Sequence, residues 1–141
     1  MANKIRWGVI GSGGIAKRRT IPEGISKAAN AELAVVYDIA QQANQDVAKQ
    51  FNAKAAASIK ELLDEDIDAV YIATPSNVHC EQTLAAAKAG KHILCEKPLG
   101  MTVKEVEKMI KACEKAKVKL GVRFWYGFVF HGGPSFALHA N

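Results

Sequence analysis

Several classes of protein are excluded by what this sequence has little of. Its 141 residues include only three cysteines, which are widely spaced, form no CxxC pair and are odd in number. We therefore expect no disulfide scaffold. We expect instead that the cysteines are buried thiols in a reducing cytoplasm. No stretch approaches the roughly 20 apolar residues that span a bilayer, and no signal peptide is recognisable. We expect a cytoplasmic, single-domain protein with no membrane partner and no metal site.

The charge excess is modest and does not indicate a nucleic-acid surface. The net charge is +5, from 19 Lys and Arg against 14 Asp and Glu. Much of the excess lies in residues 104–119, where lysines recur at helical spacing and alternate with glutamates, as on a solvated helix face. A nucleic-acid surface more often concentrates Arg and interleaves aromatic residues. We therefore predict no nucleic-acid partner.

Apolar runs alternate with helical patterns along most of the chain. The runs are rich in Val and Ile, which is typical of parallel strands covered on both faces. Ser58-Ile59-Lys60-Glu61 and Thr102-Val103-Lys104-Glu105 match the capping box that begins a helix, whereas Pro22 is expected to kink the first helix. This alternation predicts an α/β fold with a Rossmann-type, doubly wound parallel sheet. The predicted strands are residues 5–10, 32–37, 53–55, 69–73, 92–95 and 119–122.

A glycine-rich turn follows the first predicted strand. It reads Gly11-Ser12-Gly13-Gly14-Ile15-Ala16. One glycine of such a turn allows a tight bend, the next lets phosphates approach the backbone, and the small Ala16 lets the helix pack closely. The free amides at the helix start suit an anion. The turn therefore predicts a site for a dinucleotide pyrophosphate, against the alternative of an ordinary βα turn.

Asp38 ends the second predicted strand, 22 residues after Ala16. A carboxylate at about this spacing accepts hydrogen bonds from the adenosine ribose of a dinucleotide. Because a carboxylate repels a 2′-phosphate, we predict NAD in preference to NADP, although Lys17, Arg18 and Arg19 form a nearby basic cluster. The alternative is that Asp38 caps the helix beginning at Gln41.

A polar loop follows the fourth predicted strand and reads Ala73-Thr74-Pro75-Ser76-Asn77-Val78-His79. Ligands of doubly wound sheets bind outside the carboxyl ends of the strands, so Ala73, Thr74, Pro75 and Asn77 are candidate cofactor contacts. Helix capping by Ser76 or Asn77 is the alternative. We expect His79 to be packed or exposed rather than catalytic.

Glu96-Lys97-Pro98 follows the fifth predicted strand. With the glycine turn, Tyr37-Asp38, the polar loop and His92–Leu99, this triplet resembles the glucose–fructose oxidoreductase, inositol dehydrogenase and MocA family over about residues 4–122. The resemblance implies an NAD(P)-dependent oxidoreductase that transfers hydride between nicotinamide and a sugar or polyol C–OH group. It implies Lys97 as the catalytic residue, with Glu96 and Pro98 shaping the nicotinamide pocket.

The chain departs from that family after residue 122. Family members continue into a second α/β domain that supplies most substrate contacts, which this sequence lacks, so we expect little activity from the isolated chain. Residues 123–141 form an atypical aromatic, Gly- and Pro-containing tail, which we interpret as the product of truncation or frame shift. We expect self-association through residues 123–130. The alternatives are a non-catalytic NAD(H)-binding or assembly module and a relic without activity.

Overall fold

The structure, a computed structural model, describes residues 3–124 and 127–131. The chain divides into two compact units, Met1–Ala73 and Thr74–Asn141, and each is described by itself. The first unit contains β1 (Ile5–Ile10), η1 (Ser12–Ile25), β2 (Ala31–Tyr37), α1 (Gln41–Gln50), β3 (Lys54–Ala55), α2 (Ile59–Asp64) and β4 (Ala69–Ile72). The second contains η2 (Ser76–Val78), α3 (His79–Lys88), β5 (His92–Glu96), α4 (Val103–Ala116), β6 (Leu120–Phe124) and β7 (Gly127–His131).

The first unit is built on a parallel sheet with the strand order β3-β2-β1-β4. Ile10, the last residue of β1, pairs with Tyr37 of β2 and with Ile72 of β4. The carboxyl ends of these three strands therefore lie at one edge of the sheet. The segments that leave this edge are the glycine turn, Asp38 and Ala73, as the sequence predicts.

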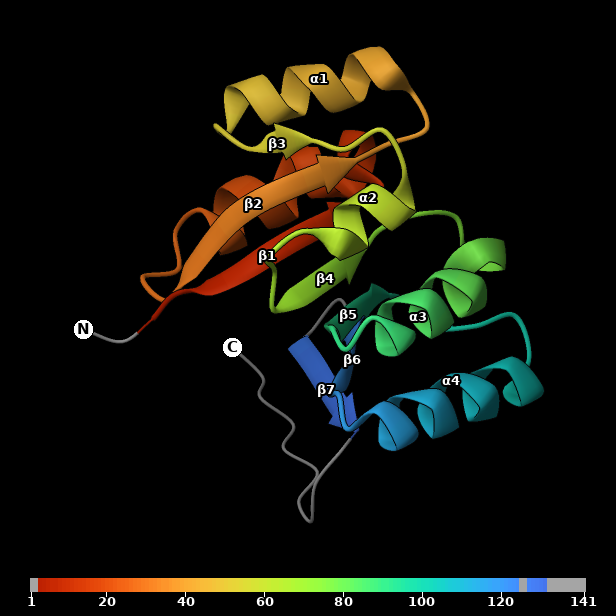
Figure 1. Ribbon diagram of the computed structural model, residues 1–141. Coiled ribbons are helices and arrows are strands. Elements are labelled where there is room, and N and C mark those ends of the chain that lie inside the picture. The colour runs from red at the N-terminus through yellow and green to blue at the C-terminus, as the bar shows by residue number, and fades with distance from the viewer. Residues whose placement is uncertain (1–2, 125–126, 132–141) are drawn as a thin grey trace. The chain divides into compact units, whose positions relative to one another are not determined.

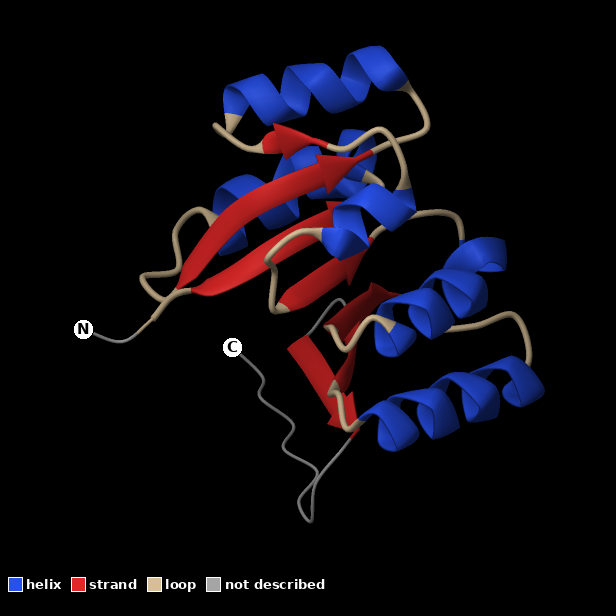
Figure 2. Cartoon of the chain, in the orientation of Figure 1, coloured by secondary structure: helices blue, strands red, loops and turns tan. Residues whose placement is uncertain are grey.

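The sheet of the first unit is covered on both faces. Figures 1 and 2 show α2 in front of β1 and β2 and the long helical segment η1 behind them. Val9, Ile10, Val36, Val70 and Ile72 are fully buried, because consecutive residues of a strand point to opposite faces and here both faces meet a helix. The nearly continuous apolar runs in the sequence have this origin.

The first helix differs from expectation in its geometry. Segment η1 has π-type hydrogen bonding and continues through Pro22. Its one residue with non-helical backbone angles is Gly14, at φ −96° and ψ −123°. Pro22 lies within this segment, where its nitrogen has no hydrogen to donate, and its backbone angles stay helical. The irregularity therefore lies at Gly14, within the glycine turn, rather than at Pro22.

The second unit packs two helices beside a smaller sheet. Helix α3 contacts both β5 and α4. Strands β5 and β6 are parallel, and β7 pairs antiparallel to β6, from Leu120 opposite His131 to Phe124 opposite Gly127. The sequence predicted β5 and β6 but not β7. Gly121 lies inside β6, within the predicted strand 119–122, and pairs with Leu94.

The predicted helix starts are confirmed. The Ser58 hydroxyl accepts the Glu61 amide hydrogen at 3.1 Å, and the Thr102 hydroxyl accepts that of Glu105 at 3.2 Å. Gly90, just beyond α3, has a φ of 74°, a conformation that favours glycine. These local signals place the helices between the strands.

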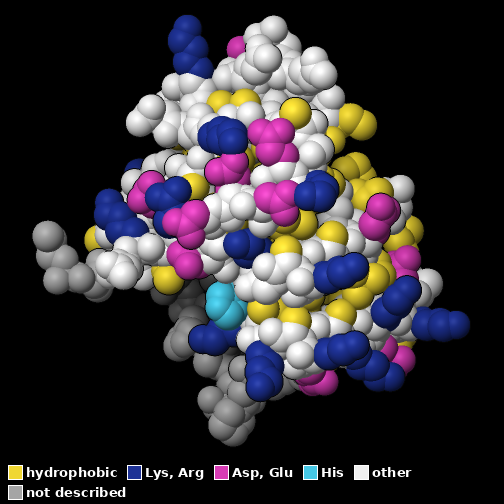
Figure 3. Space-filling model, in the orientation of Figure 1, with side chains coloured by type: hydrophobic (Ala, Val, Ile, Leu, Met, Phe, Trp, Pro, Cys, Tyr) yellow, Lys and Arg dark blue, Asp and Glu magenta, His cyan; other side chains and the backbone are white. Residues whose placement is uncertain are grey.

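The charged side chains are mixed rather than gathered. On the face in Figure 3, Lys and Arg side chains alternate with Asp and Glu. The helical spacing of lysines and glutamates noted in residues 104–119 falls mostly on α4, which begins after the Thr102 cap and ends at Ala116. Within the part of the chain that the structure describes, no helix combines the length and apolar character that a membrane span requires.

Candidate functional site

The glycine turn begins with a left-handed residue. Gly11 has φ 90° and ψ 55°, angles that a side chain would strain. Its amide donates to the Tyr37 carbonyl at 2.8 Å, which ties the turn to the end of β2. Ala16 is fully buried where η1 meets the sheet, so its small side chain allows the close helix packing that the motif predicts.

Asp38 is joined directly to the glycine turn. One carboxylate oxygen accepts the Gly13 amide hydrogen at 2.8 Å, and the other accepts that of Ala40 at 2.9 Å. The capping alternative is not observed, since the residue preceding α1 is Ala40 and no side chain caps that helix. A Cβ added at Gly13 would lie 3.1 Å from an Asp38 oxygen, so the glycine permits this close approach.

A buried polar pair, Ser12 and Asn44, links the glycine turn to α1. The Ser12 hydroxyl donates to the Asn44 side-chain oxygen at 3.2 Å, and the Asn44 amide group donates to the Ala56 carbonyl at 3.0 Å. Both side chains are nearly fully buried. The sequence identified Ser12 as a candidate but not Asn44. The only sign of Asn44 in the sequence is an amide side chain one turn after the start of α1.

The donor set of this unit fits a dinucleotide. A Cβ at Gly14 would meet no atom within 4 Å, so the backbone of the turn is open to an approaching phosphate there. Ile15, the next residue, is partly exposed. The Asp38 carboxylate, which has about four acceptor positions, uses two for Gly13 and Ala40. Two positions remain for hydroxyl groups of a ribose.

In the second unit, α3 holds the start of the polar loop. The Thr74 hydroxyl donates to Gln82, and one His79 ring nitrogen lies 2.7 Å from the Thr74 carbonyl oxygen. Neither Ser76 nor Asn77 caps η2 or α3, so the capping alternative is wrong for both. Pro75 and Asn77 are exposed. His79 is packed, as predicted, with 1% of its surface exposed.

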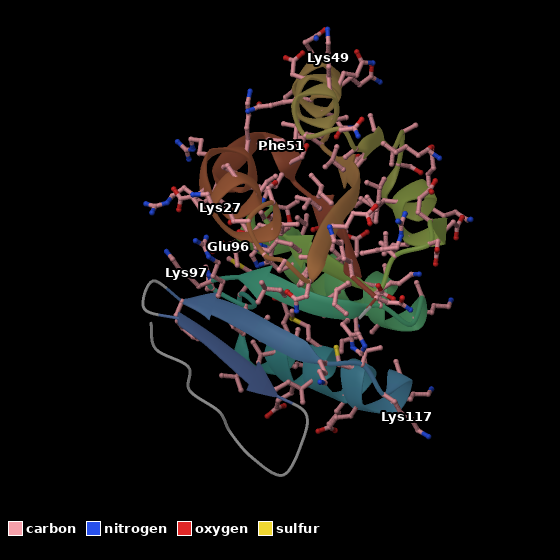
Figure 4. The ribbon with its side chains drawn as sticks, turned by 90° about the vertical axis from the view of Figure 1, so that its left-hand side faces the viewer. Lys27, Lys49, Phe51, Glu96, Lys97 and Lys117 are labelled. Carbon is pink, nitrogen blue, oxygen red and sulfur yellow. The ribbon has the colours of Figure 1, made fainter. Side chains whose placement is uncertain are left out.

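The Glu96-Lys97-Pro98 triplet leaves the carboxyl end of β5. Glu96 pairs with Arg123 of the neighbouring β6, with 2.7 Å between the carboxylate oxygen and the guanidinium nitrogen. Lys97 and Pro98 are exposed, and Figure 4 shows Glu96 and Lys97 at this end of the strand. The Arg123 partner was missed, because residues on different strands carry no shared local pattern.

Cys95, directly before the triplet, is fully buried. Burial raises the pKa of its thiol to about 12, and the negative charge of Glu96 adds to this effect. The chemically available group at the end of β5 is therefore the exposed amine of Lys97. Among the side chains that the structure describes, those of residues 3–124, no three His, Cys, Asp or Glu are grouped as metal ligands.

Comparison with known proteins identifies the class of fold and then the family. A family model described as "Oxidoreductase family, NAD-binding Rossmann fold" matches residues 5–124. The chain belongs to this glucose–fructose oxidoreductase, inositol dehydrogenase and MocA family. It is 41% identical to a 1,5-anhydro-D-fructose reductase from Ensifer adhaerens over 118 residues, which are 82% of this chain and 35% of that protein. The chain thus spans about a third of such relatives.

Solved structures agree with the fold assignment. The 3-ketoreductase KijD10 from Actinomadura kijaniata, in complex with NADP, matches with a TM-score of 0.83 and 30% identity, over 88% of this chain and 40% of that one. The WlbA dehydrogenase from Bordetella pertussis, in complex with NADH and UDP-GlcNAcA, matches with a TM-score of 0.81 and 33% identity, over 87% and 36%. The predicted Rossmann-type α/β fold is confirmed.

Proposed function

We propose that this chain is the cofactor-binding part of an NAD-dependent oxidoreductase that acts on a sugar or polyol. The observation that carries the proposal is the first unit's glycine turn, whose Gly13 amide is bound by Asp38 at 2.8 Å while the side of Gly14 stays open. A turn that is anchored on one side and open on the other is preorganised for an anionic ligand.

The first unit would hold the adenosine and pyrophosphate part of the cofactor. The turn Gly11-Ser12-Gly13-Gly14-Ile15-Ala16 presents backbone amides at the start of η1. Asp38, partly exposed and with acceptor positions left over, would accept the ribose hydroxyls. Ala73 follows β4, and its amide donates to the Ile10 carbonyl at 2.9 Å. It would line the same edge of the sheet.

The second unit would hold the nicotinamide part through the polar loop and the triplet. Exposed Pro75 and Asn77, with Thr74, would contact the cofactor, and Glu96 and Pro98 would shape the pocket. The cofactor, when bound, supplies the hydride acceptor or donor. Lys97 would hold the substrate hydroxyl at Nζ and take part in moving its proton.

The preference for NAD rests on charge. The carboxylate of Asp38 would repel the 2′-phosphate of NADP, and the next residue, Ile39, is 89% exposed and carries no charge to offset that repulsion. In the nearby basic cluster, Arg19 pairs with Glu23 at 3.2 Å. NADP stays the second choice, because solved relatives bind each cofactor.

The substrate class comes from relatives. They include a 1,5-anhydro-D-fructose reductase and a dehydrogenase in complex with UDP-GlcNAcA, and both names support a sugar as substrate here. This chain spans about a third of such proteins. We therefore propose that the chain alone binds the cofactor, and that turnover also requires residues that select the substrate.

Three further expectations remain proposals. We divide the chain into a cofactor domain at residues 1–122 and a tail at 123–141, and propose self-association through residues 123–130. Of that segment, residues 125–126 lie outside the described residues, whereas β7 is a strand paired only with β6 among the described strands. The free thiols of Cys80, Cys95 and Cys113 support a reducing cytoplasm.

The test is calorimetric titration of the chain with NAD, NADH and NADP. We expect NAD and NADH to bind more tightly than NADP, and Asp38→Ala to weaken NAD about tenfold or more, as loss of charge-assisted hydrogen bonds does. Asp46→Ala is the matched control, because Asp46 is exposed on α1 and its carboxylate accepts a hydrogen bond from Gln42 on the same helix. Absence of binding, or equal weakening by both substitutions, would contradict the proposal.

A further inference from the structure

One buried ring joins two loops of the second unit. His79 is the first residue of α3 and has 1% of its surface exposed. Its Nε2 lies 2.7 Å from the Thr74 carbonyl oxygen, and its Nδ1 lies 2.9 Å from the Pro98 carbonyl oxygen. Thr74 begins the polar loop and Pro98 ends the triplet. A single side chain thus spans two segments that are more than twenty residues apart in the printed sequence.

The chemistry of both contacts is the same. Both partners are carbonyl oxygens, which only accept hydrogen bonds, so a ring nitrogen that carries a hydrogen donates to the carbonyl that it faces. A planar ring with nitrogens on two sides, buried away from water, fixes both carbonyls in position and direction. An apolar side chain of similar size would fill the space but offer neither carbonyl a donor.

The second loop is the one that carries Lys97. Its neighbours on both sides are anchored: the Glu96 side chain by Arg123 at 2.7 Å, and the Pro98 carbonyl by His79. Lys97 itself is exposed. Because both neighbours are held, the backbone of Lys97 is fixed although its side chain is flexible. A side chain that must contact a ligand requires such a fixed backbone.

We propose that His79 is a positioning residue, which aligns the Thr74 loop and the Lys97 backbone with the nicotinamide end of the cofactor. The inference rests on the proposed function. A positioning role differs from a role in packing alone. If His79 only packed, replacing it would affect binding of the nicotinamide end of a ligand no more than binding of the adenosine end.

The experiment compares two ligands on the full chain. NADH carries the nicotinamide, and ADP-ribose lacks it. We expect His79→Leu to weaken NADH about tenfold, the size expected when buried acceptors lose their donors, and to change ADP-ribose affinity less than twofold. His79→Gln, which keeps an amide with two N–H donors, should recover most of the NADH affinity.

The control separates positioning from loss of stability. Ala86→Gly removes a fully buried methyl group from α3 and weakens the helix without touching either loop carbonyl, so both affinities should stay unchanged. If His79→Leu does not fold, His79→Asn takes its place, because its shorter amide cannot reach both carbonyls. The inference is overturned, and the proposed function is not, if His79→Leu weakens NADH and ADP-ribose binding equally. The same holds if Ala86→Gly weakens NADH binding selectively. Failure of the wild-type chain to bind either ligand overturns the proposed function and this inference with it.

Discussion

At the scale of single residues, two neighbouring glycines have different surroundings. A Cβ at Gly13 would meet Asp38 and Ala43 at 3.1 and 3.2 Å, whereas one at Gly14 would meet nothing within 4 Å. Gly13 therefore serves the protein's own contact with Asp38. Gly14 leaves space that no protein atom uses, and this is the space that we assign to a phosphate.

That difference predicts the effect of Gly14→Ala. The added methyl group enters the open side of the turn, so we expect NADH affinity to fall about tenfold. Gly24→Ala is the control, because Gly24 also lies in η1 with nothing within 4 Å of its Cβ position. Fluorescence titration with NADH measures both variants. An unchanged affinity in Gly14→Ala, or an equal loss in Gly24→Ala, would refute the assignment of the phosphate position.

The three thiols should differ in reactivity. Burial raises the pKa of Cys95 to about 12 and that of Cys113 to about 11, from an ordinary value of 9.0. It also raises the pKa of the partly exposed Cys80. A raised pKa leaves little thiolate at pH 8, and this fraction grows as pH rises. With iodoacetamide and mass spectrometry, we expect Cys80 to react first, faster at higher pH, and the other two mainly after unfolding. Early labelling of Cys95 would contradict the packing of β5.

At the scale of elements, the ion pair between β5 and β6 lies beside the triplet. Arg123 and Glu96 side chains are 26% and 15% exposed, so their pairing is less screened than that of surface charges. We expect Arg123→Gln to lower the free energy of unfolding by about 1–3 kcal/mol, since it removes a charge-assisted hydrogen bond from a largely buried carboxylate.

The matched control is Arg19→Gln. Arg19 and Glu23 form an exposed pair, with 54% of each side chain accessible, and such pairs contribute about 0.5 kcal/mol or less. Urea denaturation of the two variants compares the pairs directly. Equal losses would mean that the Glu96–Arg123 pair does not stabilise the end of β5.

The elements that the sequence predicted are those with local signals. Val- and Ile-rich runs predicted six strands within one or two residues, and the Ser58 and Thr102 caps predicted helix starts. Strand β7 was missed because its aromatic-rich segment does not continue the alternating pattern. Contacts that join distant segments, such as Asn44 with Ser12 and His79 with Pro98, leave no periodic trace and required coordinates.

At the scale of the whole molecule, β7 is the last strand in the order of the described strands. In the order β5-β6-β7, β7 has a strand neighbour on one side only among the described residues. A strand edge with free backbone groups is a template for another chain. We therefore expect sedimentation velocity to show a dimer whose population grows with concentration.

A charged residue on that strand should oppose dimer formation. Lysine on an edge strand disfavours strand addition, so Phe128→Lys should shift the protein toward monomer. Lys91→Glu is the control, because it changes a charge outside residues 123–130. A wild-type monomer at every concentration would contradict self-association through this segment.

The most direct measurement of the central claim is an amide NMR titration of the ¹⁵N-labelled chain with NADH. The account predicts that chemical shifts change in both units: at Gly13, Gly14 and Ala40 around the glycine turn and Asp38, and at Thr74, Asn77 and Lys97 in the polar loop and triplet. Residues of α4 should stay unchanged. Shifts confined to one unit, or none at saturating NADH, would contradict the claim that this chain holds a nicotinamide dinucleotide with both sets of residues.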